Sequence, residues 1–233
     1  MTAPGLFREL ADGVRVVERP QRFFGIEIGT RMTVLDGPDG ALLLHSPVRP
    51  DAALRDAVAA LGRPAWIVAP NRFHHLFAGE WQTAFPDALL LGAPGLSRKR
   101  ADLSFDGELP GDAPDAWAPI FRVACFRAMP LSNEVALLHR PSRTLVLTDL
   151  LISLRAEGPG AISGVPRAAL RLAGLRGEVG TTLLERLGTR DRRAARVFVD
   201  ELLGWDFDRI VLAHGPIVET GGHEVLRRGW SWL

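Results

Sequence analysis

The sequence predicts an α/β sandwich, in which β-sheets form the middle and helices cover both outer faces. Short β-rich segments open the chain and recur in its second half. Each group of strands is followed by segments with the apolar spacing of helices. Several strands are continuous apolar runs, which are typical of strands buried on both faces. We therefore expect one domain over residues 1–233.

The first elements are short strands separated by turns, at residues 14–18, 22–28, 31–35 and 41–45. The connection D-G-P-D-G between the last two is rich in turn-forming residues, so these strands are expected to form an antiparallel hairpin. A helix is predicted next, between Asp51 as its N-cap and Gly62 just past its end. Its apolar face contains Leu54, Val58 and Leu61.

The apolar run A-W-I-V-A at residues 65–69 predicts a buried strand, which completes a β-α-β unit. A second unit follows, with a short helix near 80–85, a strand at 88–92 and a helical stretch near 94–103. The segment 104–118 is dense in Gly, Pro and Asp, and this composition predicts a long loop.

The second half of the chain begins with three predicted strands, at residues 119–128, 134–139 and 143–149. The turn R-P-S-R joins the last two. The chain then becomes helical over residues 165–204, and it ends with a strand at 209–213 and a helix near 222–232.

Composition and charge exclude several classes of protein. Hydrophobic residues make up 47% and charged residues 24% of the chain, as in ordinary folded proteins. The net charge of +1 gives no overall field that would attract nucleic acid or an anionic membrane, so we expect neither partner. The arginine-rich segment from Arg186 to Arg196 could hold a phosphate-bearing ligand, although a solvated helix face is the more ordinary interpretation. The oligomeric state is left open.

The cell compartment follows from features that the sequence lacks. No apolar run approaches the roughly 20 residues of a membrane-spanning helix. The N-terminal segment has no basic region followed by an apolar core, which a signal peptide would need. These observations predict a cytoplasmic protein. Its single cysteine, Cys125, cannot form an internal disulfide and is expected in the core.

Three predicted strands lead to potential metal ligands. The strand at 65–69 is followed by His74 and His75, the strand at 143–149 ends at Asp149, and the strand at 209–213 is followed by His214. Imidazole and carboxylate are ligands that zinc and iron prefer. Because adjacent side chains diverge on strands and helices, the two neighbouring histidines can share an ion only if the loop curls. Chance placement is the alternative.

The order of these signals resembles the metallo-β-lactamase superfamily, whose first motif, His-x-His-x-Asp-His, follows a buried strand. The segments N-R-F-H-H at 71–75 and N-E-V-A-L-L-H-R-P-S-R-T-L at 133–145 resemble an uncharacterised branch of it that carries N-x-x-H-H and N-E-V-x-x-x-H-R-P-S-R-T-L. The resemblance spans nearly the whole chain. It implies a metallo-β-lactamase-like four-layer αββα sandwich.

The resemblance also implies a degenerate first motif. The last histidine of the motif falls on His75 and its aspartate on His74, but its two leading histidines fall on Pro70 and Arg72, which cannot bind a cation in the same way. The nearest equivalent of the superfamily's middle histidine is Ser132. One of the two metal pockets of the superfamily is therefore expected to be lost.

The other pocket is expected to hold one Zn²⁺ or Fe ion through His74, His75, Asp149 and His214. The resemblance places Arg72 toward the lost pocket, where it would supply a fixed positive charge.

Four further polar residues could bear on the site, and two of them have more than one interpretation. His45 stands where the superfamily has a supporting aspartate, and it either supports the metal ligands or is a hydrogen-bonded hinge. Glu134 is either a ligand or base, or a structural carboxylate. His139 and His223 are expected to face solvent.

Two functions follow as hypotheses. The first is a metal-dependent hydrolase that acts on a small ester, thioester, lactone or phosphoester, with Asp149 accepting a proton from water and Arg72 and Asn71 holding the oxyanion. The alternative is a non-catalytic protein of the same fold that binds a small molecule or a protein partner. In that case the histidines would be held by mutual hydrogen bonds.

Overall fold

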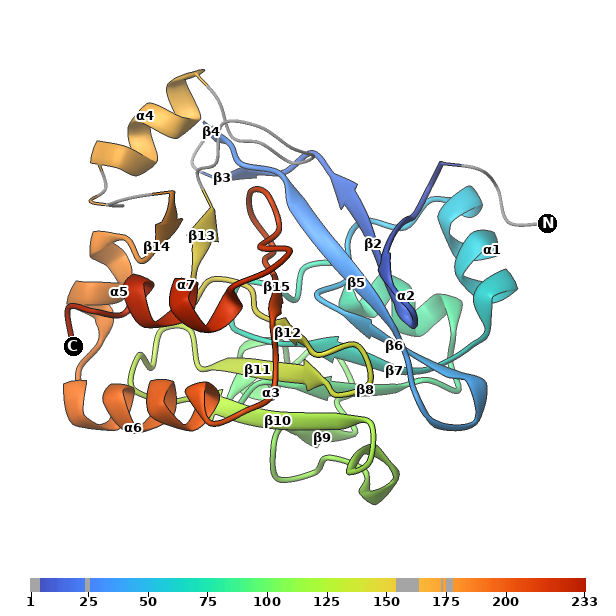
Figure 1. Ribbon diagram of the computed structural model, residues 1–233. Coiled ribbons are helices and arrows are strands. Elements are labelled where there is room, and N and C mark those ends of the chain that lie inside the picture. Colours follow the sequence, from blue (N-terminus) through green and yellow to red (C-terminus); the bar gives the residue numbers. More distant parts are fainter. Residues whose placement is uncertain (1–4, 24–25, 154–163, 173, 175–177) are drawn as a thin grey trace.

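The larger of the two main sheets contains the hairpin and β-α-β units of the first half of the chain. The computed structural model describes residues 5–23, 26–153, 164–172, 174 and 178–233 (Figure 1). The strand order of the sheet is β1-β2-β5-β6-β7-β8-β9. Neighbours from β1 to β6 are antiparallel, and those from β6 to β9 are parallel. The strands are β1 (Arg8–Ala11), β2 (Val14–Arg19), β5 (Thr30–Asp36), β6 (Ala41–His45), β7 (Arg63–Ala69), β8 (Leu89–Gly92) and β9 (Gly107–Glu108).

The smaller main sheet belongs to the second half of the chain and has the order β10-β11-β12-β15. Its first three strands are antiparallel neighbours, and β15 is parallel to β12. The strands are β10 (Phe121–Phe126), β11 (Glu134–His139), β12 (Thr144–Val146) and β15 (Arg209–Val211). Two short antiparallel pairs lie apart from both sheets, namely β3 (Arg22–Phe23) with β4 (Ile26–Glu27), and β13 (Ile152–Ser153) with β14 (Val179–Gly180).

The helices begin where the sequence supplies capping groups. The carboxylate of Asp51 accepts a hydrogen bond of 2.8 Å from the Leu54 amide, as its predicted role as N-cap requires. The helices are α1 (Ala52–Leu61), α2 (Ala78–Ala84), α3 (Leu96–Lys99), α4 (Gly164–Leu172), α5 (Leu183–Gly188), α6 (Arg192–Leu203) and α7 (Gly222–Gly229). Two 3₁₀ turns are η1 (Pro38–Gly40) and η2 (Asp115–Trp117).

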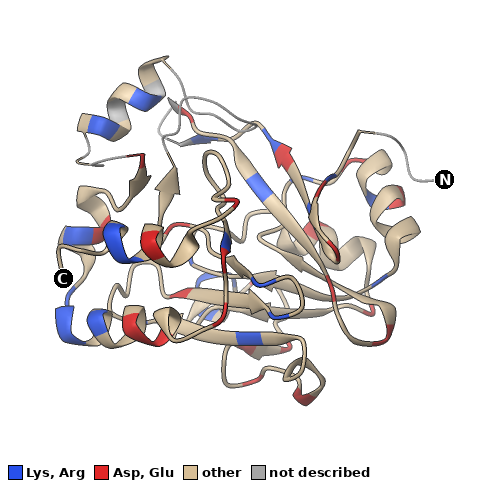
Figure 2. Ribbon diagram, viewed as in Figure 1, with Lys and Arg blue, Asp and Glu red and all other residues tan. Residues whose placement is uncertain are grey.

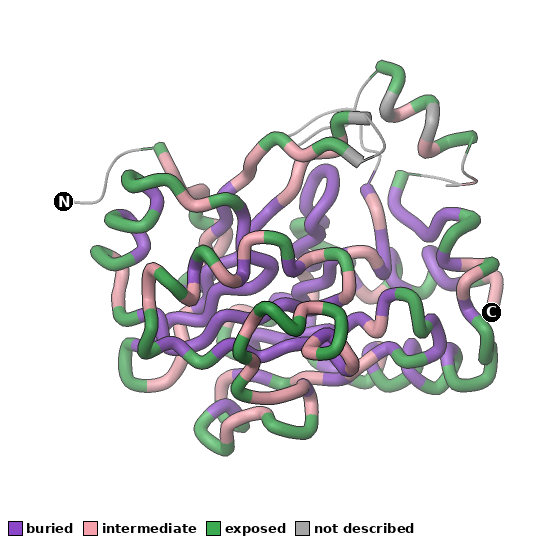
Figure 3. The backbone as a smooth tube through the Cα atoms, turned by 180° about the vertical axis from the view of Figure 1, so that it is seen from behind, coloured by how far each residue is buried: buried purple, intermediate pink, exposed green. Residues whose placement is uncertain are grey.

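Alternation along the strands divides the core into layers. Side chains of one parity, such as Leu35, Val68 and Leu137, pack between the two sheets. Neighbours of the other parity, such as Val34 and Leu138, point to the outer faces. Each of these fully buried side chains stabilises the fold by about 1.5–3 kcal/mol. The buried strands form the purple interior of Figure 3.

Helices cover both outer faces. Leu54 and Val58 of α1 and Trp81 of α2 pack on the larger sheet, and the Trp81 indole donates a hydrogen bond of 2.6 Å to the Val48 carbonyl. Phe198 of α6 and residues of α7 pack on the smaller sheet. The order helix, sheet, sheet, helix is the predicted four-layer αββα sandwich, and the predicted fold class is confirmed (Figure 1).

Some element boundaries differ from the sequence expectation. The segment 104–118 is not simply a loop, because β9 within it extends the sheet and η2 buries Trp117. The strands β1, β13 and β14 were not predicted. The predicted strand at 22–28 includes residues 24 and 25, and the predicted helical region 165–204 includes 173 and 175–177, which lie outside the described residues. The described part of the first contains β3 and β4. The described part of the second contains α4, α5 and α6, but also the strand β14, where the helical expectation was wrong.

The expectation that His139 and His223 face solvent was wrong. The His139 ring is buried, with Nδ1 2.7 Å from the Ser142 hydroxyl and Nε2 3.2 Å from the Asp36 carbonyl oxygen. His223 Nε2 lies 2.9 Å from the Trp205 carbonyl oxygen, and the ring is half-buried. Each ring lies beside a backbone carbonyl oxygen of another segment, so both histidines have structural roles.

Two expectations about surfaces concern membranes and arginines. None of the helices in the described ranges has the length and apolar character needed to cross a membrane. The arginine-rich segment lies on α5, α6 and their connection, where Figure 2 shows blue segments near the C-terminus. The guanidinium groups of Arg186 and Arg192 lie 5.9 and 5.6 Å from the Trp232 ring. These two arginines therefore pack over an aromatic side chain.

Candidate metal centre

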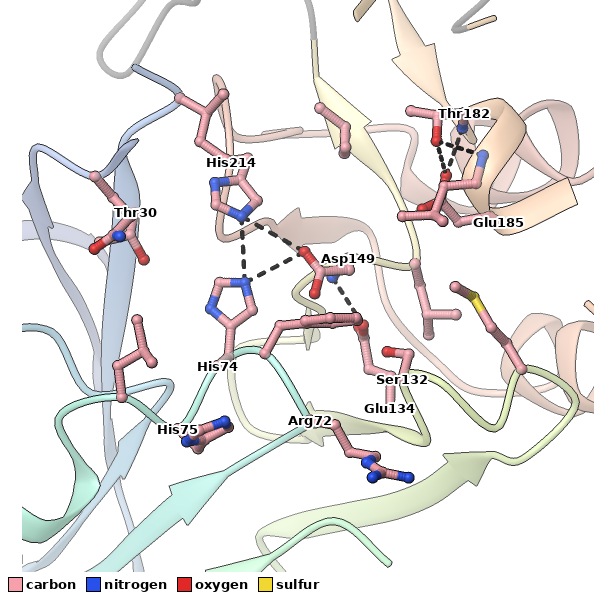
Figure 4. A pocket seen from close by; sticks show the side chains of 18 of the residues that line it. Thr30, Arg72, His74, His75, Ser132, Glu134, Asp149, Thr182, Glu185 and His214 are labelled. Carbon is pink, nitrogen blue, oxygen red and sulfur yellow. Dashed lines mark hydrogen bonds and ion pairs between the residues drawn. The ribbon is translucent and has the colours of Figure 1, made fainter. Parts of the chain in front are cut away.

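Three potential ligands meet at the carboxyl ends of β7, β12 and β15. His74 Nε2 lies 3.2 Å from His214 Nε2 and 3.3 Å from Asp149 Oδ1 (Figure 4). His214 Nε2 lies 3.5 Å from the same carboxylate oxygen. Within the described residues this is the one group of histidine, cysteine and acidic side chains close enough to hold an ion. It joins a loop of the larger sheet to two loops of the smaller sheet.

Both imidazoles of the cluster are oriented through their other nitrogen. His214 Nδ1 lies 2.8 Å from the Gly29 carbonyl oxygen, and His74 Nδ1 lies 2.8 Å from the Ser46 hydroxyl. Because a carbonyl only accepts, Nδ1 of His214 carries the proton, and its Nε2 lone pair faces the cluster. Metal-binding histidines are usually oriented in this way by a second partner.

The loop that carries His214 is fixed from both sides. The buried guanidinium of Arg31 donates to the Leu212 carbonyl and, over 2.8 Å, to the Gly215 carbonyl. Gly215 has φ +77°, and a Cβ added there would lie 2.0 Å from the Ser153 carbonyl oxygen. Only glycine fits this position, which follows His214 directly.

Asp149 is held so that one oxygen faces the imidazoles. Its Oδ2 accepts a hydrogen bond of 2.7 Å from the Asn71 amide, and its backbone N–H donates to Glu134 over 2.8 Å. Burial alone would raise the pKa of Asp149, but the neighbouring His74 and His214 outweigh it and hold this pKa well below its usual range. The carboxylate is therefore ionised at neutral pH, which is the form that binds a cation.

Asn71 is a positioning residue, which corrects the expectation that it holds an oxyanion. Its side chain is fully buried, and its carbonyl oxygen accepts from the amides of Phe73 (2.8 Å) and His74 (2.7 Å). Its NH₂ group donates to Thr148 as well as to Asp149. Every hydrogen-bonding atom of the amide is thus used inside the protein, and none remains for a substrate.

The structure does not bring His75 into the cluster, so the expected four-ligand set is reduced to three. His75 Nδ1 lies 3.0 Å from Arg100 Nη1 instead. Burial, together with the charges of Lys99 and Arg100, lowers the pKa of His75 to about 4. The ring is neutral at physiological pH and lines the cavity beside the cluster.

Arg72 does not occupy the place of a lost metal ion either. Its guanidinium donates to the Pro130 carbonyl over 3.4 Å, and Figure 4 shows it directed away from His74 and Asp149. The Arg72 amide donates to the Ser132 carbonyl over 3.0 Å. Arg72 still lines the cavity, but its guanidinium lies away from His74 and Asp149, so its expected contact with an oxyanion at the cluster stays a prediction.

Glu134 and His45 are buried, and neither belongs to the cluster. Glu134 accepts from the Thr148 amide over 2.7 Å as well as from Asp149, which favours the structural interpretation. Burial and the adjacent charge of Asp149 raise the pKa of Glu134 to about 7. Burial lowers the pKa of His45 to about 3, and its Nε2 has no hydrogen-bond partner within the described part of the chain.

Sequence reasoning missed Ser46 and Arg31, which orient the two histidines of the cluster. Ser46 directly follows β6, whose carboxyl end lies beside that of β7, so the rule that found His74 could have found it. Arg31 is a charged residue at the start of an otherwise apolar strand, and that contrast was the available signal.

The cluster fits a zinc-sized ion. Donor atoms about 2.0–2.2 Å from a tetrahedral zinc ion lie about 3.3–3.6 Å from each other. The three separations in the protein are 3.2, 3.3 and 3.5 Å. Two imidazoles and one carboxylate are also a ligand set of zinc sites that keep an open position. The cluster lines a cavity of about 440 Å³, which connects such a position to solvent.

Comparisons with known proteins give a family match and, from solved structures, a likeness in fold. The model of a family described as "Domain of unknown function (DUF4336)" matches residues 11–185. No curated protein matches the chain. Among solved structures, a metallo-β-lactamase from Pontibacter korlensis is similar, with a TM-score of 0.62 and 10% identity over 97% of this chain and 96% of that chain.

Two further structures extend this likeness. The metallo-β-lactamase FIM-1 from Pseudomonas aeruginosa, in its mono-zinc form, has a TM-score of 0.60 and 11% identity over 97% of this chain and 94% of its own. A putative diflavin flavoprotein fragment from Nostoc sp. PCC 7120 has a TM-score of 0.66 and 11% identity over 97% and 95%. At such low identity the likeness shows the fold alone. It confirms that this chain resembles the metallo-β-lactamase superfamily in its fold.

Proposed function

The chain belongs to the family described as domain of unknown function (DUF4336) and has the metallo-β-lactamase fold, and we propose that it is a hydrolase dependent on a single metal ion. His74, Asp149 and His214 would hold the ion, with Zn²⁺ preferred over Fe. The substrate class is a small ester, thioester, lactone or phosphoester, and the expected location is the cytoplasm. The observation that carries the proposal is the spacing of the three donor atoms, which matches the edges of a zinc tetrahedron.

A bound zinc ion supplies Lewis acidity, which lowers the pKa of a coordinated water and polarises a substrate oxygen. The protein supplies orientation. Ser46 and the Gly29 carbonyl fix the two imidazoles, and Asn71 fixes the carboxylate of Asp149. These partners are buried or part of the backbone, so the ligand geometry is set before a substrate arrives.

The reaction uses Asp149 to move a proton. The oxygen of water forms a bond to the acyl carbon or the phosphorus, and the bond from that atom to the leaving oxygen or sulfur breaks. Asp149 accepts the proton of the attacking water and delivers it to the leaving atom, so charge and atoms balance. The lowered pKa of Asp149 keeps this carboxylate ionised at neutral pH, so it carries no proton of its own before the reaction.

The alternative of a non-catalytic binding protein is favoured by one observation. The two side chains expected to hold an oxyanion do not reach the cluster, because Asn71 is used internally and Arg72 turns outward. In a protein that only binds, the contacts among His74, His214 and Asp149 would close the cavity wall by themselves.

Zinc titration separates the two functions. Calorimetric titration of metal-free protein is expected to give about one equivalent of bound zinc, and zinc at 100 times its Kd should add about 2.7 kcal/mol to the free energy of unfolding. Less than about a tenth of an equivalent, with an unchanged melting temperature, would contradict the metal-dependent hydrolase.

Single histidine variants test the ligand set. His74→Ala and His214→Ala should each weaken zinc binding more than about 100-fold, since each removes one of three donors. His75→Ala is the matched control, because His75 is adjacent to His74 and lines the same cavity without joining the cluster. Equal losses in all three variants would refute the three-ligand assignment.

A further inference from the structure

The cavity that contains the cluster has a largely apolar lining. On one side, Phe126, Met129 and Leu150 contribute side chains that belong to the core between the smaller sheet and its helices. Leu184 of α5 lies on the same cavity. The volume of about 440 Å³ is within the range of sites for small molecules, which runs from about 300 to 1,000 Å³.

Part of the lining is apolar surface that remains exposed. Phe73, Leu76 and Leu184 line the cavity, and their exposed fractions are 38%, 53% and 49%. Side chains of this kind, gathered around one cavity, mark a surface that a ligand would cover. Transfer of an apolar group from water to such a surface is favourable by about 25 cal/mol per Å².

The polar groups of the lining lie on two sides of Asp149, and they differ in their hydrogen-bond partners. Figure 4 shows Thr182 and Glu185 on one side of Asp149, and His74 and His75 on the other. Thr182 donates to the Glu185 carboxylate from its amide (2.6 Å) and its hydroxyl (2.5 Å), so these two residues satisfy each other. A neighbouring apolar group would therefore leave this pair's hydrogen bonds intact.

Ser132 differs from that pair. It lines the cavity, it is 4% exposed, and its hydroxyl has no hydrogen-bond partner within the described residues. An unpaired buried hydroxyl is costly, and a polar atom of a ligand would satisfy it. The lining has two basic residues, Arg72 and Lys99, as well as the acidic residues Glu134, Asp149 and Glu185, so these charged groups do not favour an anion, and an uncharged polar group is enough to pair with Ser132.

We propose that the cavity binds an amphiphile in which an apolar chain lies against Phe126, Met129, Leu150 and Leu184, and an uncharged polar group bonds to Ser132. This inference rests on the proposed function, because it makes the substrate an ester or thioester with an apolar acyl group. The carbonyl end of such a molecule lies at the metal centre, and its chain extends toward α5.

A series of straight-chain alcohols tests the apolar subsite without any catalysis. Binding of 1-butanol, 1-hexanol and 1-octanol to metal-free protein is measured by calorimetry. Each added methylene should lower Kd about fourfold, if the chain is buried in the cavity. A Kd that does not change along the series would overturn the proposal.

Two tryptophan variants of α5 test where the apolar chain of the ligand lies. Leu184→Trp fills the cavity and should weaken 1-octanol binding at least about tenfold, with a smaller effect on 1-butanol. Leu187→Trp is the matched control, because Leu187 lies on the same helix, is 81% exposed and does not line the cavity. Equal effects of the two substitutions would contradict the proposed position of the ligand's chain. If Leu184→Trp fails to fold, the alcohol series on the wild-type protein decides whether the cavity binds an apolar chain.

Ser132→Ala tests the polar contact. Loss of one hydrogen bond should raise Kd for every alcohol by the same factor, about two- to tenfold, and leave the fourfold step per methylene unchanged. An unaltered Kd for the alcohols would contradict the proposed hydrogen bond between Ser132 and the polar group of the ligand.

Zinc titration of the same preparations separates this inference from the proposed function. One equivalent of zinc with no dependence on chain length overturns the apolar subsite and leaves the hydrolase standing. Dependence on chain length without zinc binding supports the subsite and overturns the hydrolase.

Discussion

At the scale of single residues, Asn71 decides how the loop after β7 presents its histidines. Its carbonyl oxygen holds the amides of Phe73 and His74, which curls the chain at this point. As a result His74 faces Asp149, while His75 faces Arg100. Two adjacent residues of the same type therefore have different surroundings because of one amide side chain.

Cys125 provides a test of burial at this scale. Burial raises the pKa of its thiol to about 12. Only the thiolate reacts with iodoacetamide, so alkylation of the native protein at pH 8 should be at least about 100-fold slower than alkylation in urea, where the pKa returns to about 8.5. Mass spectrometry of timed samples measures both rates. Rapid labelling of native protein would show that the strand β10 exposes its cysteine.

At the scale of elements, apolar patterns predicted most strands and helices, because burial in a layered sandwich is what produces those patterns. The strand-end rule also brought His74, Asp149 and His214 to one edge, because β7, β12 and β15 all end there. The roles of His75, Arg72 and Asn71 could not be predicted this way. They also depend on partners far along the chain, which no local pattern contains. Asn71 contacts Glu134 and Asp149, the Arg72 guanidinium reaches Pro130, and His75 lies beside Arg100.

The helix α5 gives a prediction about pH. Its capping box buries Glu185, and burial raises the pKa of this carboxyl group. As pH rises above about 4.3, the unfolded chain loses this proton before the folded chain does, so folding stability falls through the raised pKa. Glu185→Gln keeps a capping acceptor and cannot ionise. Its urea midpoint, relative to wild type, should therefore increase between pH 4 and pH 7.

Glu224→Gln on α7 is the control for that measurement, because Glu224 is exposed and its ion pair is with Arg227 at 2.8 Å, on the same exposed helix face. This variant should show no gain in relative midpoint as pH rises. A Glu185→Gln curve parallel to the wild-type curve at every pH would contradict a raised pKa for Glu185.

At the scale of the whole molecule, the metal centre lies where the two sheets meet. His74 follows a strand of the larger sheet, and Asp149 and His214 follow strands of the smaller sheet. An ion held by all three would link the two halves of the sandwich, so zinc binding and global stability should change together. Arg31 links the same halves through protein atoms, because it lies on β5 and contacts the loop after β15.

Arg31→Met tests that link. The side chain is 2% exposed and pairs with Glu18 at 2.7 Å, while its other donors reach the Leu212 and Gly215 carbonyls. Methionine fills the space but leaves these acceptors without a donor, so the free energy of unfolding should fall by about 2–4 kcal/mol. Because His214 lies between the two carbonyls, zinc affinity should fall as well, by about 10- to 100-fold.

The matched control is Arg22→Met, because the Arg22 side chain is 76% exposed and its partner Glu27 lies 3.8 Å away. An exposed pair of this kind contributes about 0–1 kcal/mol, so both urea midpoint and zinc affinity should stay near wild type. The informative outcome is the combination in Arg31→Met. A lower midpoint with unchanged zinc affinity would mean that Arg31 stabilises the sandwich without orienting His214, and the link between the two sheets would then not extend to the metal centre.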